Sequence, residues 1–270
     1  MKIFRKPKQL QKWARLQRAS GRRIALVPTM GYLHEGHMSL IEKAKRKKAD
    51  EIIVSIFVNP VQFGPNEDFE KYPRDERADL AKCKAAGATA VFFPTPQNVY
   101  LEDHSVFVNE RNLSQGLCGA RRPGHFEGVC TVVAKLFNIA QPHFAVFGQK
   151  DYQQYKIIER MVRDLNFDLE VVLAPIVREK SGLAKSSRNS YLSESEAEAA
   201  TVLSKGLASL RGNGNLSSLK RRIESAGLKV DYVEAVDSET LKRVKKIQKG
   251  VCVLVAAYCG KTRLIDNILI

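Results

Sequence analysis

The chain has 270 residues, 44% of them hydrophobic, and its 44 Lys and Arg against 29 Asp and Glu give a formal net charge of +15. This length predicts two domains of about 150 residues each, with enough apolar residues for a true core. The longest clear apolar run, residues 251–259, is much shorter than the ~18 residues of a membrane span. Together with an N-terminus that lacks an apolar signal segment, it predicts a cytoplasmic protein without a membrane partner. The five cysteines are widely spaced and form no CxxC pair, which argues against a disulfide framework or a zinc site and predicts buried thiols.

Predicted strands and helices alternate over the first two thirds of the chain. Helices are expected at 7–20, 37–49, 74–86, 126–139 and 152–165, and strands at 23–28, 51–58, 89–93, 143–148 and 168–175, with a short further strand at 105–108. This alternation predicts βαβ units, and right-handed crossovers then give a parallel, doubly wound sheet. We therefore predict an α/β domain over residues 1–175.

From about residue 176 the sequence becomes polar and rich in serine, and we predict a smaller α+β domain over 176–270. One helix is expected to begin at Ser193, because Glu196 three residues later completes a capping-box pattern. A second helix follows the Gly-Asn-Gly turn at 212–214. Three strands, expected in a short antiparallel sheet, lie at 229–237, 251–259 and 263–270.

Polar side chains follow several of the predicted strands, where a doubly wound sheet binds its ligands. Asn59 and Gln62 follow the second strand, and their neutral amides suit hydroxyls and carboxylates as well as ordinary turns. Lys150 follows the strand at 143–148 and offers a point charge for phosphate. The second domain opens with residues 182–189, where Arg188 is a fork-shaped donor, although a plain surface loop is the alternative.

Two histidines, His34 and His37, come directly after the strand at 23–28 and are accompanied by Gly31 and Gly36. They could be metal ligands, but no further His or Cys stands at ligand spacing. They could be core histidines, although a pair flanked by glycines after a strand is unusual for that role. The third interpretation is a phosphate site, since free amides and the positive end of a helix dipole would face the ligand there.

Two other patterns suggest nucleotides or nucleic acids. Gly260-Lys261-Thr262 is not a P-loop, because the glycine required five residues before the Gly-Lys pair is Val255. The basic runs at 43–48 and 241–246 contain no aromatic residues and are typical of solvated helix faces, so we expect no specific nucleic-acid partner. A nucleic-acid-binding protein remains the alternative from a different functional class, because the net charge is high.

Taken in chain order, these segments resemble the family of pantoate–β-alanine ligases, also called pantothenate synthetases, within the HxGH nucleotidyltransferases. The resemblance covers residues 24–192 in order, which is far more specific than the single HxGH pattern. Another nucleotidyltransferase of that superfamily would share only the first motif. The matching motifs are PTMGxLHxGH at 28–37, FVNPxQF at 57–63, YPR at 72–74, RPGHFxGVxTVVxKLF at 122–137, FGxKDxQQ at 147–154, PIVRE at 175–179 and GLAxSSRNxYL at 182–192.

The resemblance implies a Rossmann-like domain followed by a smaller C-terminal lid domain. It implies that ATP and Mg²⁺ support the condensation of pantoate with β-alanine to pantothenate through a pantoyl-adenylate, with release of AMP and pyrophosphate. Family members are typically homodimers, so a homodimer in the cytoplasm is expected.

The resemblance also assigns roles to residues. His37 is expected to donate a proton, with His34, Lys150 and Arg188 completing the catalytic set. The residues expected to contact ATP are Met30, Gly31, Tyr32, Leu33, His34, Glu35, Gly36, His37, Gly148, Gln149, Lys150, Asp151, Val177, Lys185, Ser186, Ser187 and Arg188.

Two glutamines are expected to bind the other substrates: Gln62 both pantoate and β-alanine, and Gln154 pantoate. Two positions depart from the family pattern. Lys185 stands where the family usually has methionine or leucine, and Ser181 stands where it usually has aspartate. Lys185 would either add a phosphate contact or point to solvent. Neither departure touches the central His, Gln, Lys and Arg residues, so they bear on ATP affinity rather than on the reaction.

Overall fold

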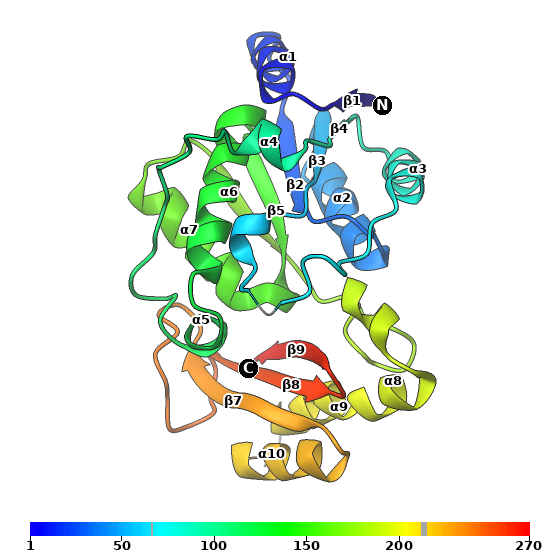
Figure 1. Ribbon diagram of the computed structural model, residues 1–270. Coiled ribbons are helices and arrows are strands. Elements are labelled where there is room, and N and C mark those ends of the chain that lie inside the picture. Colours follow the sequence, from blue (N-terminus) through cyan, green and yellow to red (C-terminus); the bar gives the residue numbers. More distant parts are fainter. Residues whose placement is uncertain (66, 212–214) are drawn as a thin grey trace. The chain divides into compact units, whose positions relative to one another are not determined.

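The computed structural model describes residues 1–65, 67–211 and 215–270 (Figure 1). The chain divides into two compact units. The first unit comprises Met1–Gly148 and Gln154–Ala174, and the second comprises Gln149–Gln153 and Pro175–Ile270. The turn expected at 212–214 lies outside the described residues.

A six-stranded parallel sheet forms the centre of the first unit. The predicted α/β class with a parallel sheet is thereby confirmed. In sheet order the strands are β1 (Lys2–Phe4), β4 (Ala90–Phe92), β3 (Glu51–Ile56), β2 (Ile24–Thr29), β5 (Phe144–Gly148) and β6 (Glu170–Ala174).

Helices cover both faces of this sheet. The elements between the strands are α1 (Pro7–Ala19), α2 (Glu35–Arg46), η1 (Pro60–Gln62), α3 (Glu76–Ala86), α4 (Pro96–Val99), α5 (Leu117–Arg121), α6 (His125–Ala140), η2 (Gln149–Asp151) and α7 (Tyr152–Asp164). Helix α2 contacts β2, β3 and β5, while α1 and α6 contact each other and β2. A sheet buried on both faces explains why its central strands are continuous apolar runs rather than alternating ones.

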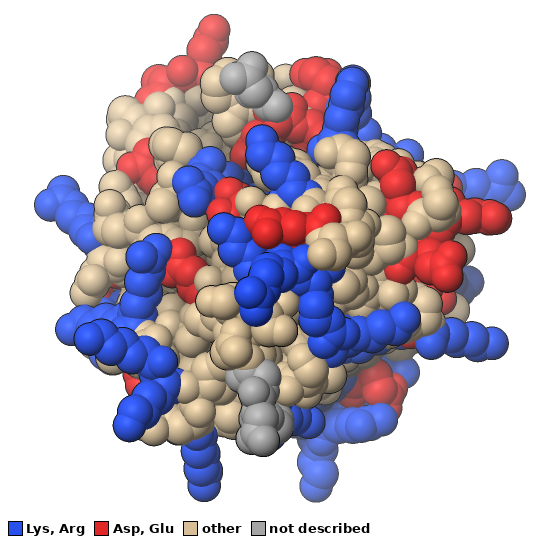
Figure 2. Space-filling model, turned by 90° about the horizontal axis from the view of Figure 1, so that it is seen from below, with Lys and Arg blue, Asp and Glu red and all other residues tan. Residues whose placement is uncertain are grey.

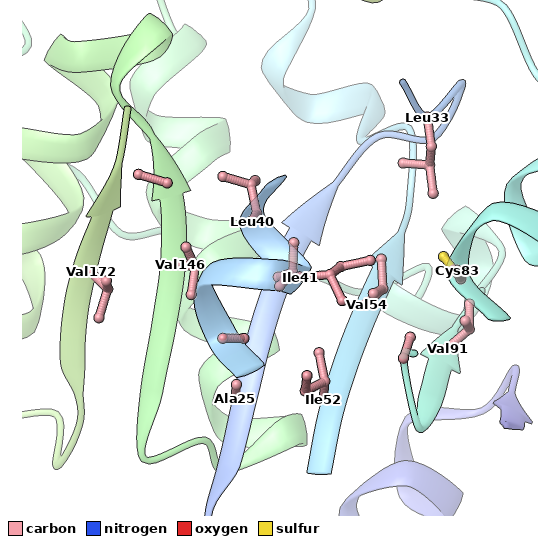
Figure 3. Packing of buried hydrophobic residues seen from close by; sticks show 14 of the residues in the cluster. Ala25, Leu33, Leu40, Ile41, Ile52, Val54, Cys83, Val91, Val146 and Val172 are labelled. Atoms are coloured by element: carbon pink, nitrogen blue, oxygen red, sulfur yellow. The ribbon is translucent and has the colours of Figure 1, made fainter. Parts of the chain in front are cut away.

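One apolar core cluster of the first unit lies between α2 and one face of the sheet (Figure 3). Ala25, Val54 and Val146 lie on three neighbouring strands and belong to one cluster with Ile41 of α2, and all four side chains are fully buried. Alternate residues of a strand point to opposite faces. The intervening Leu26 is also fully buried, so the opposite face is covered as well.

Two strands of this unit differ between the sequence-based expectations and the structure. Strand β1 was not predicted, because it has only three residues and pairs along β4 at the sheet edge. The strand expected at 105–108 is wrong. Val106 and Phe107 are 75% and 44% exposed, and the Val108 amide donates to the Thr131 hydroxyl (2.9 Å) rather than to a strand. Four residues of apolar alternation were too few to specify pairing.

The second unit contains a three-stranded antiparallel sheet, β7–β8–β9, as predicted. Its elements are η3 (Ser187–Tyr191), α8 (Glu194–Ala200), α9 (Val202–Ala208), η4 (Ser209–Arg211), α10 (Leu216–Ser225), β7 (Lys229–Asp237), β8 (Val251–Cys259) and β9 (Thr262–Leu269). Helix α10 contacts β7, and α9 contacts β9. The Ser193–Glu196 capping box forms, but the single expected helix is divided into α8 and α9 at the buried Thr201.

Basic side chains are dispersed over the surface shown in Figure 2, where they are interspersed with acidic and neutral residues. Several are paired within the second unit. Arg243 makes two hydrogen bonds to the Glu234 carboxylate (2.7 and 2.6 Å), and Arg263 contacts Asp231 at 2.8 Å. None of the described helices is long and apolar enough to cross a membrane.

Candidate active site

Three segments expected to bind ligands meet at one edge of the first unit's sheet. Strand β2 lies between β3 and β5, and all three are parallel, so their carboxyl ends share that edge. Met30 follows β2, η1 with Gln62 follows β3, and Gly148 ends β5. This is the edge where doubly wound sheets bind ligands.

The two histidines lie at the N-terminus of α2, where His34 is the N-cap residue. The Gly36 amide donates to His34 Nδ1 (3.1 Å), and the His34 amide donates to His37 Nδ1 (3.2 Å). Both rings are half-buried, and their centroids lie 4.1 Å apart. Because each Nδ1 accepts a hydrogen bond, each neutral imidazole carries its proton on Nε2 and is a donor there.

This arrangement favours one of the three interpretations of the histidine pair. Half-buried rings at a helix terminus are not core histidines. Within the described residues no group of three or more His, Cys, Asp or Glu is arranged to hold a metal ion. Imidazole donors at the N-terminus of a helix, which is the positive end of its dipole, suit a phosphate.

The turn after β2 requires glycine at position 31. Thr29 Oγ1 donates to the Ser55 carbonyl (2.7 Å) and accepts from the Gly31 amide (3.2 Å). Gly31 has φ +84°, and a Cβ there would lie 2.9 Å from both Asp79 Oδ2 and Ile56 Cγ2. Any other residue at position 31 would be strained, both by these close contacts and by the left-handed backbone.

A buried carboxylate holds the next two residues. Asp79 of α3 is 2% exposed and accepts from the Tyr32 amide (2.8 Å) and the Leu33 amide (2.7 Å). Lys82, one turn later, donates to the Leu33 carbonyl (2.6 Å). Burial raises the pKa of the Asp79 carboxyl, although the two backbone hydrogen bonds favour its ionised form. Helix α3 therefore fixes the path of the chain into the histidine pair.

A second cluster holds Gln62 close to Met30. Asn59, 1% exposed, donates through Nδ2 to Gln62 Oε1 (3.2 Å) and to the Gly128 carbonyl (3.1 Å). The Tyr100 hydroxyl donates to Asn59 Oδ1 (2.8 Å). Gln62 Nε2 lies 3.0 Å from Met30 Sδ, so residues from two different strand ends are brought together.

An ion pair fixes the segment that follows Gln62. Arg122 makes two 2.6 Å hydrogen bonds to the Glu67 carboxylate and also contacts His125 Nε2 (2.9 Å). His125 Nδ1 lies 2.9 Å from the Gln62 carbonyl. Burial raises the pKa of Glu67, but the hydrogen bonds and charge of Arg122 outweigh it and hold that pKa below its ordinary value.

In the second unit, β9 positions the backbone around Lys150. Asn267, 1% exposed, donates through Nδ2 to the carbonyls of Gln149 (2.8 Å) and Lys150 (3.0 Å). Its Oδ1 accepts from Gln149 Nε2 (3.2 Å). The Lys150 ammonium lies 3.6 Å from the Asp151 carboxylate, which leaves a cation and an anion side by side at the start of α7.

Val177 and the residues 185–188 are joined by a short loop. The Lys185 amide donates to the Val177 carbonyl (2.9 Å), and the Ser186 hydroxyl accepts from the Arg188 amide (3.3 Å). The Lys185 ammonium contacts Glu179 (3.1 Å), so this unusual lysine has an acidic partner within the same loop. Arg178 connects the loop to β9, because it makes two hydrogen bonds (2.6 and 3.0 Å) to Asp266 of that strand.

Comparison with known proteins identifies the family. A family model described as pantoate-beta-alanine ligase matches residues 2–269. The chain belongs to the pantoate–β-alanine ligase family. Pantothenate synthetase from Clostridium acetobutylicum is 53% identical over 277 residues, which cover 99% of this chain and 98% of that protein. The corresponding enzyme from Enterococcus faecalis is 52% identical over 277 residues and also covers 99% and 98%.

Solved structures of the pantoate–β-alanine ligase family also match over the full chain. Pantothenate synthetase from Thermus thermophilus has a TM-score of 0.91 and 41% identity, covering 100% of this chain and 99% of that one. The ligase from Francisella tularensis, complexed with beta-gamma ATP and beta-alanine, has a TM-score of 0.84 and 36% identity over 100% and 97%. The protein is thus an enzyme, a ligase of pantothenate biosynthesis.

The residues expected to form the ligase site are divided between the two units. Met30–His37, Gln62, Gly148 and Gln154 belong to the first unit, where Gln154 is half-buried on α7. The remaining predicted residues belong to the second unit and are Gln149, Lys150, Asp151, Val177, Lys185, Ser186, Ser187 and Arg188.

Sequence reasoning missed three residues that contact the segments of the candidate site: Asp79, Tyr100 and Asn267. An acidic residue in the first turn of a helix is ordinary, so Asp79 carried no distinguishing signal. The tyrosine and the asparagine lie outside the motif segments, and only the folded chain brings them to Asn59 and Lys150.

Proposed function

We propose that this ligase binds ATP and forms pantothenate in two steps through a pantoyl-adenylate. A carboxylate oxygen of pantoate attacks the α-phosphorus of ATP, and pyrophosphate leaves. The amine of β-alanine then attacks the acyl carbon of the adenylate, AMP leaves, and the nitrogen loses its proton. The F. tularensis relative, solved with beta-gamma ATP and beta-alanine, supports both the nucleotide and the amine.

The observation that carries this proposal is the orientation of the two imidazoles. His34 and His37 use Nδ1 as the acceptor for backbone amides, so the Nε2 proton of each neutral ring can be donated to a phosphate oxygen. Attack on the α-phosphate increases negative charge on its oxygens and on the leaving pyrophosphate. Fixed donors and the N-terminus of α2 stabilise that charge without reorganising.

The remaining roles follow the family resemblance. Lys150 and Arg188 supply positive charge for the phosphates, and Gln62 and Gln154 bind pantoate, with Gln62 also serving β-alanine. The proposed ATP contacts are Met30 to His37, Gly148 to Asp151, Val177 and Lys185 to Arg188. An acyl-adenylate hydrolyses readily, so we propose that residues 176–270 act as a lid that excludes water.

Magnesium fits this scheme as a companion of the nucleotide. Mg²⁺ is usually held by substrate phosphates, waters and one or two carboxylates rather than by a protein cage. The described residues contain no cage of three or more ligands, and the Asp151 carboxylate beside Lys150 offers a single acidic contact. Bound with ATP, Mg²⁺ would neutralise phosphate charge.

The family resemblance also supports a homodimer in the cytoplasm. Sedimentation at micromolar concentration tests the dimer, for which twice the 30.3 kDa chain mass is expected. Cell fractionation tests the location. A monomer across that concentration range, or recovery in the membrane fraction, would reject the respective proposal.

The decisive assay measures AMP, pyrophosphate and pantothenate with purified enzyme. We expect pyrophosphate to form with ATP and pantoate, and pantothenate only after β-alanine is added. Oxygen-18 in the pantoate carboxylate should appear in AMP, because one carboxylate oxygen becomes the bridge to phosphorus and remains with it. ATP turnover that is indifferent to pantoate, or AMP without label, would reject the mechanism.

Two substitutions separate the roles of the His37 nitrogens. His37→Asn retains an acceptor near the Nδ1 position for the His34 amide but removes the Nε2 donor, whereas His37→Gln retains an amide donor near Nε2. We expect His37→Asn to keep the melting temperature and to lose most adenylate formation. His37→Gln should retain more activity. Near-normal activity of His37→Asn would show that the Nε2 donor is not needed.

A further inference from the structure

Gly128 and Asn59 determine which atom Gln62 presents to a substrate. The Gly128 carbonyl can only accept, so the Asn59 atom 3.1 Å away must be the Nδ2 donor. The second Nδ2 hydrogen is directed at Gln62, 3.2 Å away, and the Gln62 atom that receives it must therefore be Oε1. Gln62 Nε2 is then the end of its amide that is directed toward Met30.

Tyr100 completes this chain from the other side. Its hydroxyl donates to Asn59 Oδ1 at 2.8 Å, and Asn59 is only 1% exposed, so water does not readily replace that donor. The Tyr100 ring packs near Phe57, with centroids 6.3 Å apart, and near an edge-on His104 at 4.9 Å. The Lys135 ammonium lies 5.4 Å from the ring centroid. The hydroxyl is thereby fixed in place.

The backbone behind Gln62 is equally constrained. Helix α6 contacts η1 directly. A Cβ at Gly128 would lie 2.6 Å from the Val61 carbonyl oxygen and 2.7 Å from Gln62 Cα. Gln62 itself is 8% exposed. Both its main chain and the orientation of its amide are therefore determined before any substrate arrives, which lowers the entropy cost of binding.

We propose that Tyr100 is a positioning residue that, through Asn59, holds Gln62 with its Nε2 donor facing an acceptor oxygen of the acid substrate. The acceptor is a carboxylate or hydroxyl oxygen of pantoate, and the same donor suits the carboxylate of β-alanine but not its ammonium group. Tyr100 itself does not touch the substrate. The inference rests on the proposed binding of pantoate by Gln62.

The test compares KM values for pantoate and ATP in Tyr100→Phe, Gln62→Ala and the double variant. Tyr100→Phe removes one hydroxyl and should raise the KM for pantoate about three- to tenfold, with little change in the KM for ATP. In the Gln62→Ala background the same substitution should have no further effect, because its action passes through Gln62. Tyr155→Phe is the matched control, since it removes a hydroxyl bonded to Glu159 (2.9 Å) on α7.

A further variant tests the direction of the amide. Gln62→Glu keeps an oxygen for Asn59 to contact but replaces the donor by an acceptor oxygen, so it should raise the KM for pantoate more than Gln62→Ala does. A Gln62→Glu enzyme that binds pantoate better than Gln62→Ala would overturn the assigned orientation. Additive effects of Tyr100→Phe and Gln62→Ala would overturn the positioning role. If Gln62→Ala leaves the KM for pantoate unchanged, the proposed function of Gln62 fails as well.

Discussion

The buried carboxylate of Asp79 should control both stability and ATP binding. Asp79→Asn retains one acceptor oxygen and places an amide donor against the second backbone N–H, either that of Tyr32 or that of Leu33. A hydrogen bond to a charged acceptor contributes about 1.5–3 kcal/mol. Burial raises the pKa of Asp79, so the neutral amide avoids part of the cost of burying a charge. We expect a net loss of about 2 kcal/mol in the free energy of unfolding.

The same substitution at Asp75 is the matched control. Asp75 caps the same helix through a 3.0 Å hydrogen bond from the Ala78 amide, and it is exposed. Asparagine is an equally good N-cap, so Asp75→Asn should change the free energy of unfolding by less than about 0.5 kcal/mol. Asp79→Ala should cost more than Asp79→Asn, about 3–4 kcal/mol, because both backbone amides lose their acceptor.

Denaturant unfolding and steady-state kinetics measure the two consequences separately. Displacement of the Tyr32–Leu33 backbone should raise the KM for ATP by about tenfold in Asp79→Asn, equivalent to about 1.4 kcal/mol of binding free energy. The Asp75→Asn enzyme should keep the wild-type KM. If Asp79→Asn has wild-type stability and a wild-type KM for ATP, the carboxylate does not hold the loop and the reasoning is refuted.

Three further predictions concern single residues. Gly31→Ala should lower the free energy of unfolding by about 2 kcal/mol, since the new Cβ makes a close contact and also strains a left-handed backbone. Gly21 has φ +74° and open space around it, so Gly21→Ala should show the cost of the backbone strain alone. Equal losses in the two variants would contradict a role for the close contact. Burial and nearby arginines lower the pKa of His143, so the stability it contributes is present above pH 6.5 and is lost as pH falls through its folded pKa. The free energies of unfolding of wild type and His143→Asn, measured in urea, should therefore diverge at acidic pH, with the wild type losing more stability. Parallel dependence on pH in the two proteins would contradict this prediction. In a thiol titration at pH 8, Cys118 should react fastest. Rapid reaction of several thiols in the native protein would contradict this prediction. Burial raises the pKa of three other thiols to about 12: Cys83, Cys130 and Cys252.

The parallel sheet could be predicted because its central strands are buried on both faces. Ile24 to Val27 and Ile52 to Val54 are continuous apolar runs, and helices of regular length separate them. The strand β1 was not predictable in this way, since three residues with two exposed side chains carry no periodic signal. The division of the helix expected over 193–210 at Thr201 was equally hidden, because a threonine within a helical pattern is common.

The candidate site was predictable where its residues are adjacent in the chain or directly follow a strand of the sheet. The glycines and histidines of 31–37 follow a strand and therefore suggested phosphate binding from local rules. Asp79 lies more than forty residues later and acts through its carboxylate on backbone amides, which leave no trace in the composition of the loop. Tyr100 reaches Gln62 only through Asn59, and no local sequence pattern connects Tyr100 with Asn59.

The chain passes between the two units three times, since residues 149–153 belong to the second unit while the flanking β5 and most of α7 belong to the first. Neither unit can therefore be produced as a single uninterrupted polypeptide. A fragment that ends at residue 174 would retain the carbonyls of Gln149 and Lys150 but lose the Asn267 amide that binds them. Separation of residues 175–270 from the rest of this enzyme, whether by proteolysis, gene splitting or domain exchange, would thus change the surroundings of Lys150.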